Sequence, residues 1–101
     1  MHEYKSYLET LRRLDCIIYM ELVSFVSLYA GAKAEETAIS MLGTISRIAI
    51  NDSKLLYSKV CETVGRANTT FASQDPPIAG IPDDSIDTLV DDIMRDRPRF
   101  A

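Results

Sequence analysis

The chain has 101 residues, which is enough for one domain at most. Hydrophobic residues make up 47% of it, a share typical of globular proteins and too high for a disordered one. The net charge is −4, and residues 67–101 carry the excess, with seven acidic and three basic side chains. No basic face is left to neutralise phosphates, so the sequence argues against a nucleic-acid partner.

The first predicted helix spans residues 4–30. Apolar side chains recur there at three- and four-residue steps, which is typical of a helix with one buried stripe. The stripe comprises Tyr4, Leu8, Leu11, Ile18, Leu22, Phe25 and Tyr29. From Cys16 to Ala30, twelve of fifteen residues are apolar, too many for a helix covered on one side only. We therefore expect a second subunit to pack against this segment.

The same apolar run bears on where the protein is found. It is about 15 residues long and contains Glu21, Ser24 and Ser27, which makes it too short and too polar to span a bilayer. The first nine residues are polar and lack the apolar core of a signal peptide. The sequence therefore predicts a soluble, cytoplasmic protein without a membrane partner.

A turn is predicted over residues 31–36, where Gly31 can adopt the left-handed conformation that ends many helices. Glu35 and Glu36 suit the first turn of a second helix, because the helix dipole favours negative charge there. That helix is predicted over residues 35–67 and, after so short a connection, lies antiparallel to the first. Its apolar stripe comprises Ala38, Leu42, Ile45, Ala49, Leu56, Val60 and Val64. Asp52 interrupts the stripe.

The two helices form a hairpin that we expect to dimerise, or to assemble further with copies of itself. The predicted fold is all-α: a long antiparallel helical hairpin that dimerises into a four-helix bundle, plus a short C-terminal helix. The predicted interface comprises Ile18, Leu22, Phe25, Tyr29, Leu42, Ile45 and Leu56.

The last third of the chain is predicted to hold one short helix. Residues 68–82 contain Asn-Thr-Thr, Asp-Pro-Pro and Gly-Ile-Pro, a composition typical of a linker. An acidic helix is predicted over residues 83–95, with Asp83 or Ser85 as its N-cap, and residues 96–101 are predicted to fray. This helix either packs on the dimer or lies in a groove of another protein. Its apolar face comprises Ile86, Leu89, Val90 and Ile93.

Two carboxylates, Glu21 and Asp52, interrupt the apolar stripes of the predicted hairpin. With the run Glu21-Leu-Val-Ser-Phe-Val-Ser-Leu-Tyr29 and the continuation through Ile48-Ala-Ile-Asn-Asp52, they make residues 15–62 resemble the first hairpin of a ferritin-like or rubrerythrin-like protein. In that family a Glu and, two turns later, a Tyr precede a second helix that carries an acidic residue and a His three positions on. The resemblance implies a metal site with Glu21 and Asp52 as ligands, beside Tyr29, for iron or manganese.

The sequence departs from the family pattern where the metal-binding His is expected. Leucines stand three positions after Asp52 and Ser53, and the single His of the chain is His2. In a symmetric dimer, two copies each of Glu21 and Asp52 offer four carboxylates, which suit a hard cation. Alternatively, the two carboxylates hold no metal and fix the helix register through ordinary polar partners. The candidate partners are Lys54, Arg47 and Tyr29.

Nucleophilic catalysis has no support in the sequence. Cys16 and Cys61 have no His nearby, and no glycine-rich phosphate loop is present. We expect both thiols to be reduced and half-buried, although a hairpin brings them towards the same end and leaves a bridge open. The sequence thus predicts a non-enzymatic homo-oligomeric assembly or adaptor protein on a ferritin-like scaffold, without a cofactor. The alternative is a small ferritin-like metal-binding oxidase or iron-handling protein assembled from half-bundles.

Overall fold

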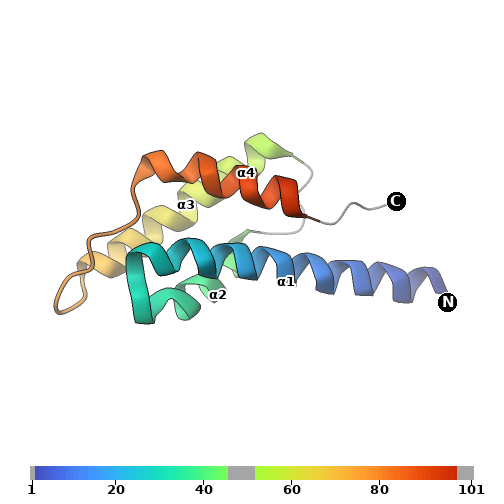
Figure 1. Cartoon of the computed structure of the whole chain (residues 1–101), viewed down its shortest axis with the longest axis horizontal. Helices are drawn as coiled ribbons and strands as arrows, with labels where there is room; N and C mark the ends of the chain where they lie inside the picture. The colour runs from blue at the N-terminus through green and yellow to red at the C-terminus, as the bar shows by residue number, and fades with distance from the viewer. Residues whose placement is uncertain (1, 46–51, 98–101) are drawn as a thin grey trace.

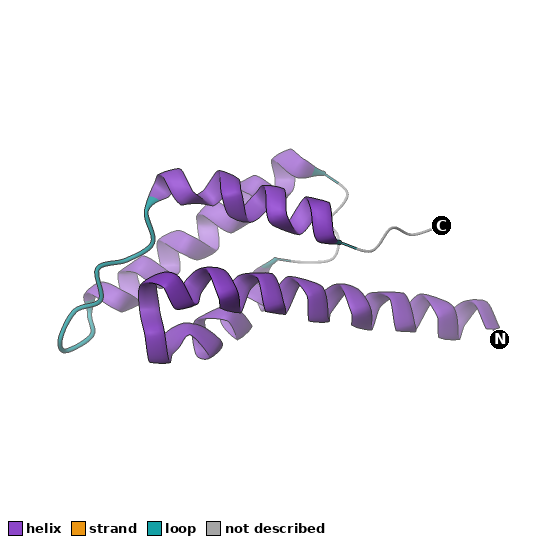
Figure 2. Ribbon diagram, in the orientation of Figure 1, coloured by secondary structure: helices purple, strands orange, loops and turns teal. Residues whose placement is uncertain are grey.

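The structure is a computed structural model that describes residues 2–45 and 52–97. In the first helix the description of residues 2–4, 6–8 and 10 is limited to the backbone. The described residues are helical and include no strand, so the predicted all-α class is confirmed (Figure 2). The molecule measures 52 × 24 × 17 Å. Its length comes from α1 (His2–Ala30), whose N-terminal part extends beyond the other helices (Figure 1). Predictions for four side chains fall outside the description: Tyr4, Leu8, Arg47 and Ala49.

The chain turns back after α1 through one turn of 3-10 helix, η1 (Gly31–Lys33), which leads directly into α2 (Ala34–Thr44). Gly31 has a φ of +52°, a left-handed conformation that glycine adopts without steric cost, so the predicted glycine at this turn is confirmed. Glu35 and Glu36 lie in the first turn of α2, also as predicted. α2 therefore folds back against the C-terminal half of α1 (Figure 1).

The second predicted helix is wrong as a single element. The sequence predicts one helix over residues 35–67, but α2 ends at Thr44 and α3 (Ser53–Ala72) begins as a separate helix. The start of α3 is set by Asp52, whose Oδ1 accepts hydrogen bonds from the backbone N–H groups of Lys54 (3.0 Å) and Leu55 (3.1 Å). Its backbone is extended, as an N-cap requires. The polar interruption of the apolar stripe therefore marks a helix start.

α3 also runs further than predicted, through the first five residues of the expected linker. Thr69 and Thr70 donate their hydroxyl hydrogens to carbonyls one turn earlier in the same helix, which satisfies both groups. Phe71 lies in the core at 2% exposure. Burial of this ring outweighs the weak helix propensity of the two threonines.

The last helix of the described chain packs on its own chain. A loop over residues 73–82 leads into a turn of 3-10 helix, η3 (Asp83–Ser85), and then into α4 (Ile86–Asp96). α4 lies against both α1 and α3 (Figure 1). The buried residues of α4 are the four that the sequence predicts: Ile86, Leu89, Val90 and Ile93. Much of the apolar surface of α1 is therefore covered without a second subunit.

The core lies among the four α-helices formed by residues 2–45 and 52–97. The residues predicted as a dimer interface belong to this core. Five of them are buried in it, namely Ile18, Leu22, Phe25, Ile45 and Leu56, and Tyr29 and Leu42 pack against it half-buried. An apolar stripe shows that a helix face is covered, but not whether the same chain or another copy covers it. A surface that binds a second copy must therefore use other residues.

The side chain of Asn68, in α3, binds the loop of residues 73–82 through two hydrogen bonds. Its side-chain amide donates to the carbonyl of Ile81 (3.0 Å), and its Oδ1 accepts from the N–H of Ile81 (2.7 Å). We expect Asn68→Ala to lower the free energy of unfolding by about 2 kcal/mol, because both backbone groups of the buried Ile81 lose their partner. Urea denaturation measures the change. Thr69→Ala is the control, because it removes one exposed hydrogen bond at the next residue of α3. Equal effects of the two substitutions would contradict the role of Asn68.

Candidate functional site

The two predicted metal ligands have different partners in the structure. Asp52 is exposed and caps α3, so its predicted position inside an apolar stripe is wrong. Glu21 is half-buried and hydrogen-bonds Asp96 in the last turn of α4. The ring of Tyr29 packs edge-on against Phe25, with centroids 5.4 Å apart. Among the side chains that the structure describes, no group of three or more His, Cys, Asp or Glu is placed to hold a metal ion.

Glu21 and Asp96 form a contact between α1 and α4 that depends on one proton. The hydrogen bond with Asp96, partial burial and the nearby charges of Asp96 and Asp92 raise the pKa of Glu21 to about 7, against a smaller opposing effect of Arg95. Arg95 donates to both carboxylate oxygens of Asp96, at 3.0 and 3.1 Å, and is the main reason that the pKa of Asp96 falls to about 2. Glu21 therefore holds the proton and donates it to an ionised Asp96.

We expect Glu21→Gln to stabilise the protein at pH 8 and to leave its stability unchanged near pH 4.5. The pKa of Glu21 is raised from 4.5 in the unfolded chain to about 7 in the fold. The stabilisation by its proton is thus complete below pH 4.5 and is lost as the pH rises through 7. Gln donates the same hydrogen bond at every pH. Because solvent screens this half-exposed group, the expected gain at pH 8 is about 1 kcal/mol.

Urea denaturation at the two pH values measures this difference. Asp91→Asn is the matched control, because Asp91 is an exposed carboxylate of α4. A gain for Glu21→Gln that is equal at both pH values, or no larger than that of the control, would contradict the shared proton.

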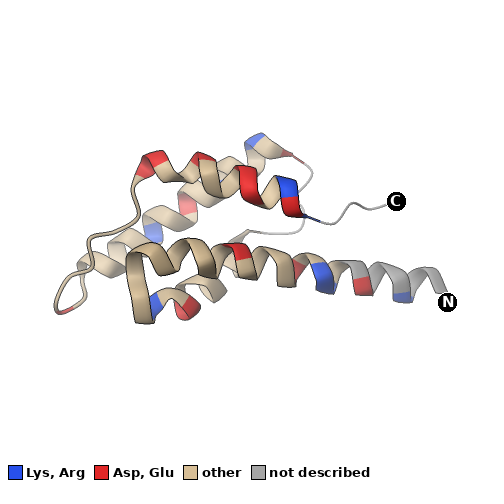
Figure 3. Cartoon of the chain, in the orientation of Figure 1, with Lys and Arg blue, Asp and Glu red and all other residues tan. Residues whose placement is uncertain are grey.

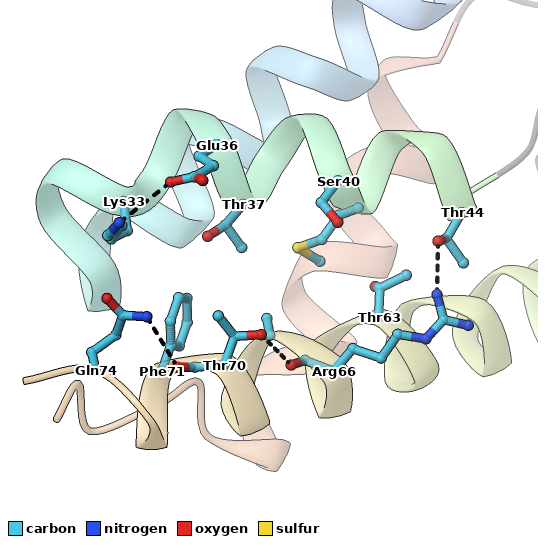
Figure 4. Close-up of a pocket in the computed structure, with 12 residues that line it drawn as sticks. Lys33, Glu36, Thr37, Ser40, Thr44, Thr63, Arg66, Thr70, Phe71 and Gln74 are labelled. Carbon is cyan, nitrogen blue, oxygen red and sulfur yellow. Dashed lines mark hydrogen bonds and ion pairs between the residues drawn. The ribbon is translucent and has the colours of Figure 1, made fainter.

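A hollow of about 220 Å³ lies between α2 and α3 (Figure 4). Short side chains face it from both helices and leave the space unfilled, chiefly Thr37, Ser40, Thr63 and Thr70. The charged groups at its rim have partners on the protein: Arg66 binds Thr44 and Glu62, and Lys33 binds Glu36. An open hollow whose charged groups are already paired selects no particular ligand.

The surface of α1 that faces away from the core is the most unusual surface of the described chain. We call it the outer face; it comprises Cys16, Ile17, Met20, Ser24, Ser27 and Leu28. Met20 is 63% exposed and Leu28 is 75% exposed. No residue of this face is charged, and Glu21, the single charged residue between Cys16 and Ala32, is directed towards α4. Charged side chains gather instead towards the N-terminal half of α1 and at the corner with α2 (Figure 3).

The residues of α1 that the sequence predicts as a dimer interface lie on the opposite, buried side of this segment. The segment from Cys16 to Ala30 has more apolar residues than one buried stripe can include, so some of them lie on the exposed surface of α1. The residues left over after the stripe is removed recur at four-residue steps, as Cys16, Met20, Ser24 and Leu28. That second periodicity was the available signal for the outer face.

The stretch Leu11–Thr44 is long and apolar enough to cross a membrane, by length and composition alone. It is longer than the apolar run from Cys16 to Ala30 because it includes α2. Core helices of soluble proteins and signal sequences meet the same criterion. In this chain 33% of the most apolar window is buried in the protein, and the chain reverses within the stretch at Gly31. Within this stretch, α1 is therefore packed against the protein on one face and exposed on the other.

No protein-family model, curated protein or solved structure matches this chain. The resemblance of residues 15–62 to a ferritin-like hairpin gains no support from these comparisons.

Proposed function

We propose that this protein is a non-enzymatic assembly protein that binds a second copy of itself through the outer face of α1. The observation that carries the proposal is the exposure of Met20 and Leu28 on a face that bears no charge. Contiguous apolar surface of this kind on a small domain is typical of a binding surface. Because the outer face runs along a single helix, it suits another helix better than a small molecule.

Burial of the outer face supplies a driving force for association. A fully buried Leu or Met side chain contributes about 1.5–3 kcal/mol. In a two-fold interface each residue counts twice, so Ile17, Met20 and Leu28 become six apolar side chains. Together they offset the loss of translational and rotational entropy on association, which costs about 4–15 kcal/mol.

The alternative, a metal-binding oxidase, has no observation in its favour. Asp52 is engaged as the N-cap of α3, and Glu21 shares a proton with Asp96. A carboxylate that keeps a proton near neutral pH is a poor ligand for a hard cation, because metal binding requires the ionised form. An assembly role needs neither residue as a ligand.

Sedimentation velocity on the purified protein tests the proposal. We expect a species of twice the 11.3 kDa chain mass at micromolar concentration. A folded monomer throughout that range would overturn the proposal. Metal analysis of the same sample provides a second test: near-stoichiometric iron or manganese that is lost in Glu21→Ala would favour the oxidase.

A further inference from the structure

We infer that the two copies pair through antiparallel α1 helices, with the two-fold axis crossing the outer face between Met20 and Ser24. The inference rests on the proposed self-association and specifies its geometry. In this register Met20 lies opposite Ser24 of the second copy, and Cys16 lies opposite Leu28. Two properties of the outer face support the arrangement: the sizes of its side chains and the charges at its two ends.

Side-chain size favours the antiparallel register. Along the four-residue repeat, the outer face carries a small, a large, a small and a large side chain: Cys16, Met20, Ser24 and Leu28. Antiparallel pairing about the centre places each large side chain against a small one, which gives layers of similar volume. Parallel pairing would place Leu28 against Leu28 and Ser24 against Ser24, so layers of two large side chains would alternate with layers of two small ones. Layers of similar volume fill the space between two helices more evenly.

The charges at the ends of the face favour the same register. Exposed Arg12 and Arg13 precede the face, with exposed Glu9 one turn earlier. Exposed Glu35 and Glu36 follow the face at the corner between η1 and α2, where Glu36 pairs with Lys33. With a rise of 1.5 Å per residue, Arg12 lies about 15 Å from the centre of the face, and the corner lies about as far in the other direction. Antiparallel pairing therefore brings the arginines of one copy to the glutamates of the other, at both ends of the interface.

A second copy fits these charges better than a lipid surface does. Helices that lie on membranes border their apolar face with Lys and Arg, because cellular membranes are anionic. Here one end of the face carries two arginines against one glutamate, Glu9, and the other carries two glutamates against one lysine, Lys33. Such a face is complementary to itself when reversed and would be repelled at one end by an anionic bilayer.

Thiol cross-linking tests the register. In a Cys61→Ser background, Cys16 alone should form no disulfide between chains on mild oxidation, because antiparallel pairing keeps the two Cys16 residues apart. Leu28→Cys in that background weakens the dimer, so it is oxidised at a protein concentration above its raised dissociation constant. It should then give a cross-linked dimer, since Cys16 and position 28 face each other. The two positions lie about 18 Å apart along one helix, so no bridge can form within a chain. Leu28→Cys with Cys16→Ser is the matched control and should remain uncross-linked.

The outcomes separate the register from the self-association itself. Cross-linking of Cys16 alone establishes parallel pairing and overturns the inference. A dimer by sedimentation in which no variant cross-links overturns the register but not the proposed function. If every variant is a monomer, both the register and the proposed self-association are overturned. The same holds if the monomer binds anionic vesicles.

Charge reversal provides a measurement that does not depend on oxidation. Arg12→Glu with Arg13→Glu should raise the dissociation constant about tenfold, and Glu35→Arg with Glu36→Arg should do the same. The four substitutions together should restore the affinity of the original chain, because each end again meets its opposite. Additive weakening in the fourfold variant would overturn the antiparallel arrangement.

Discussion

Leu28→Glu is expected to convert the proposed dimer into a folded monomer. Leu28 is 75% exposed, so the substitution leaves the core of the chain intact. In the dimer each copy loses the burial of one Leu side chain, about 1.5–3 kcal/mol, and the loss occurs twice in a two-fold interface. The dissociation constant should therefore rise at least about a hundredfold, before the cost of bringing a carboxylate into the interface is added. Sedimentation velocity measures the shift, and circular dichroism should show unchanged helix content.

Leu55→Glu is the matched control for this experiment. Leu55 is also an exposed apolar residue, at 39%, but it lies in the first turn of α3 and not on the outer face. We expect its dissociation constant to match that of the original chain. An equal weakening by both substitutions would point to a general effect of charge, and an unaltered dimer in Leu28→Glu would place the interface on another surface.

Ile93→Ala is expected to lower the free energy of unfolding by about 2–5 kcal/mol, a large share of the 5–15 kcal/mol typical of a domain. Ile93 is fully buried where α4 packs on α1 and α3, and the neighbouring helices cannot close around the space that its side chain leaves. Urea denaturation gives the value at a fixed protein concentration, because association adds to apparent stability.

Thr88→Ala is the control within α4. Thr88 is exposed, and its replacement by a better helix former should change stability by less than about 0.5 kcal/mol in either direction. A loss below about 1 kcal/mol in Ile93→Ala would show that α4 is not part of the cooperative fold. That result would reopen the possibility that this helix binds a different protein.

Local signals in the sequence predicted the elements that local physics decides. The glycine at position 31 and the two glutamates after it were correct because a left-handed turn and a helix N-terminus each select residue types directly. The apolar face of α4 was correct because four apolar residues at helical spacing allow one interpretation.

The errors arose where one pattern is compatible with two structures. Asp52 within an apolar stripe fits a buried carboxylate in a long helix, and it also fits the cap of a new helix. The second interpretation holds because the side chain satisfies two backbone N–H groups that a buried position would not offer. Similarly, the buried stripe of α1 fits a dimer interface or an internal core, and the packing of α4, which no local pattern reveals, decides between them.

The position of α4 in the chain has a consequence during synthesis. The core stripe of α1 is complete once residue 30 has left the ribosome, but α4 begins 56 residues later. Until α4 is made, α2 covers only part of the core stripe of α1, and the outer face is exposed at the same time. Nascent chains on neighbouring ribosomes therefore expose more apolar surface to each other than the finished protein does. The interval before α4 is synthesised is thus a period in which aggregation competes with folding.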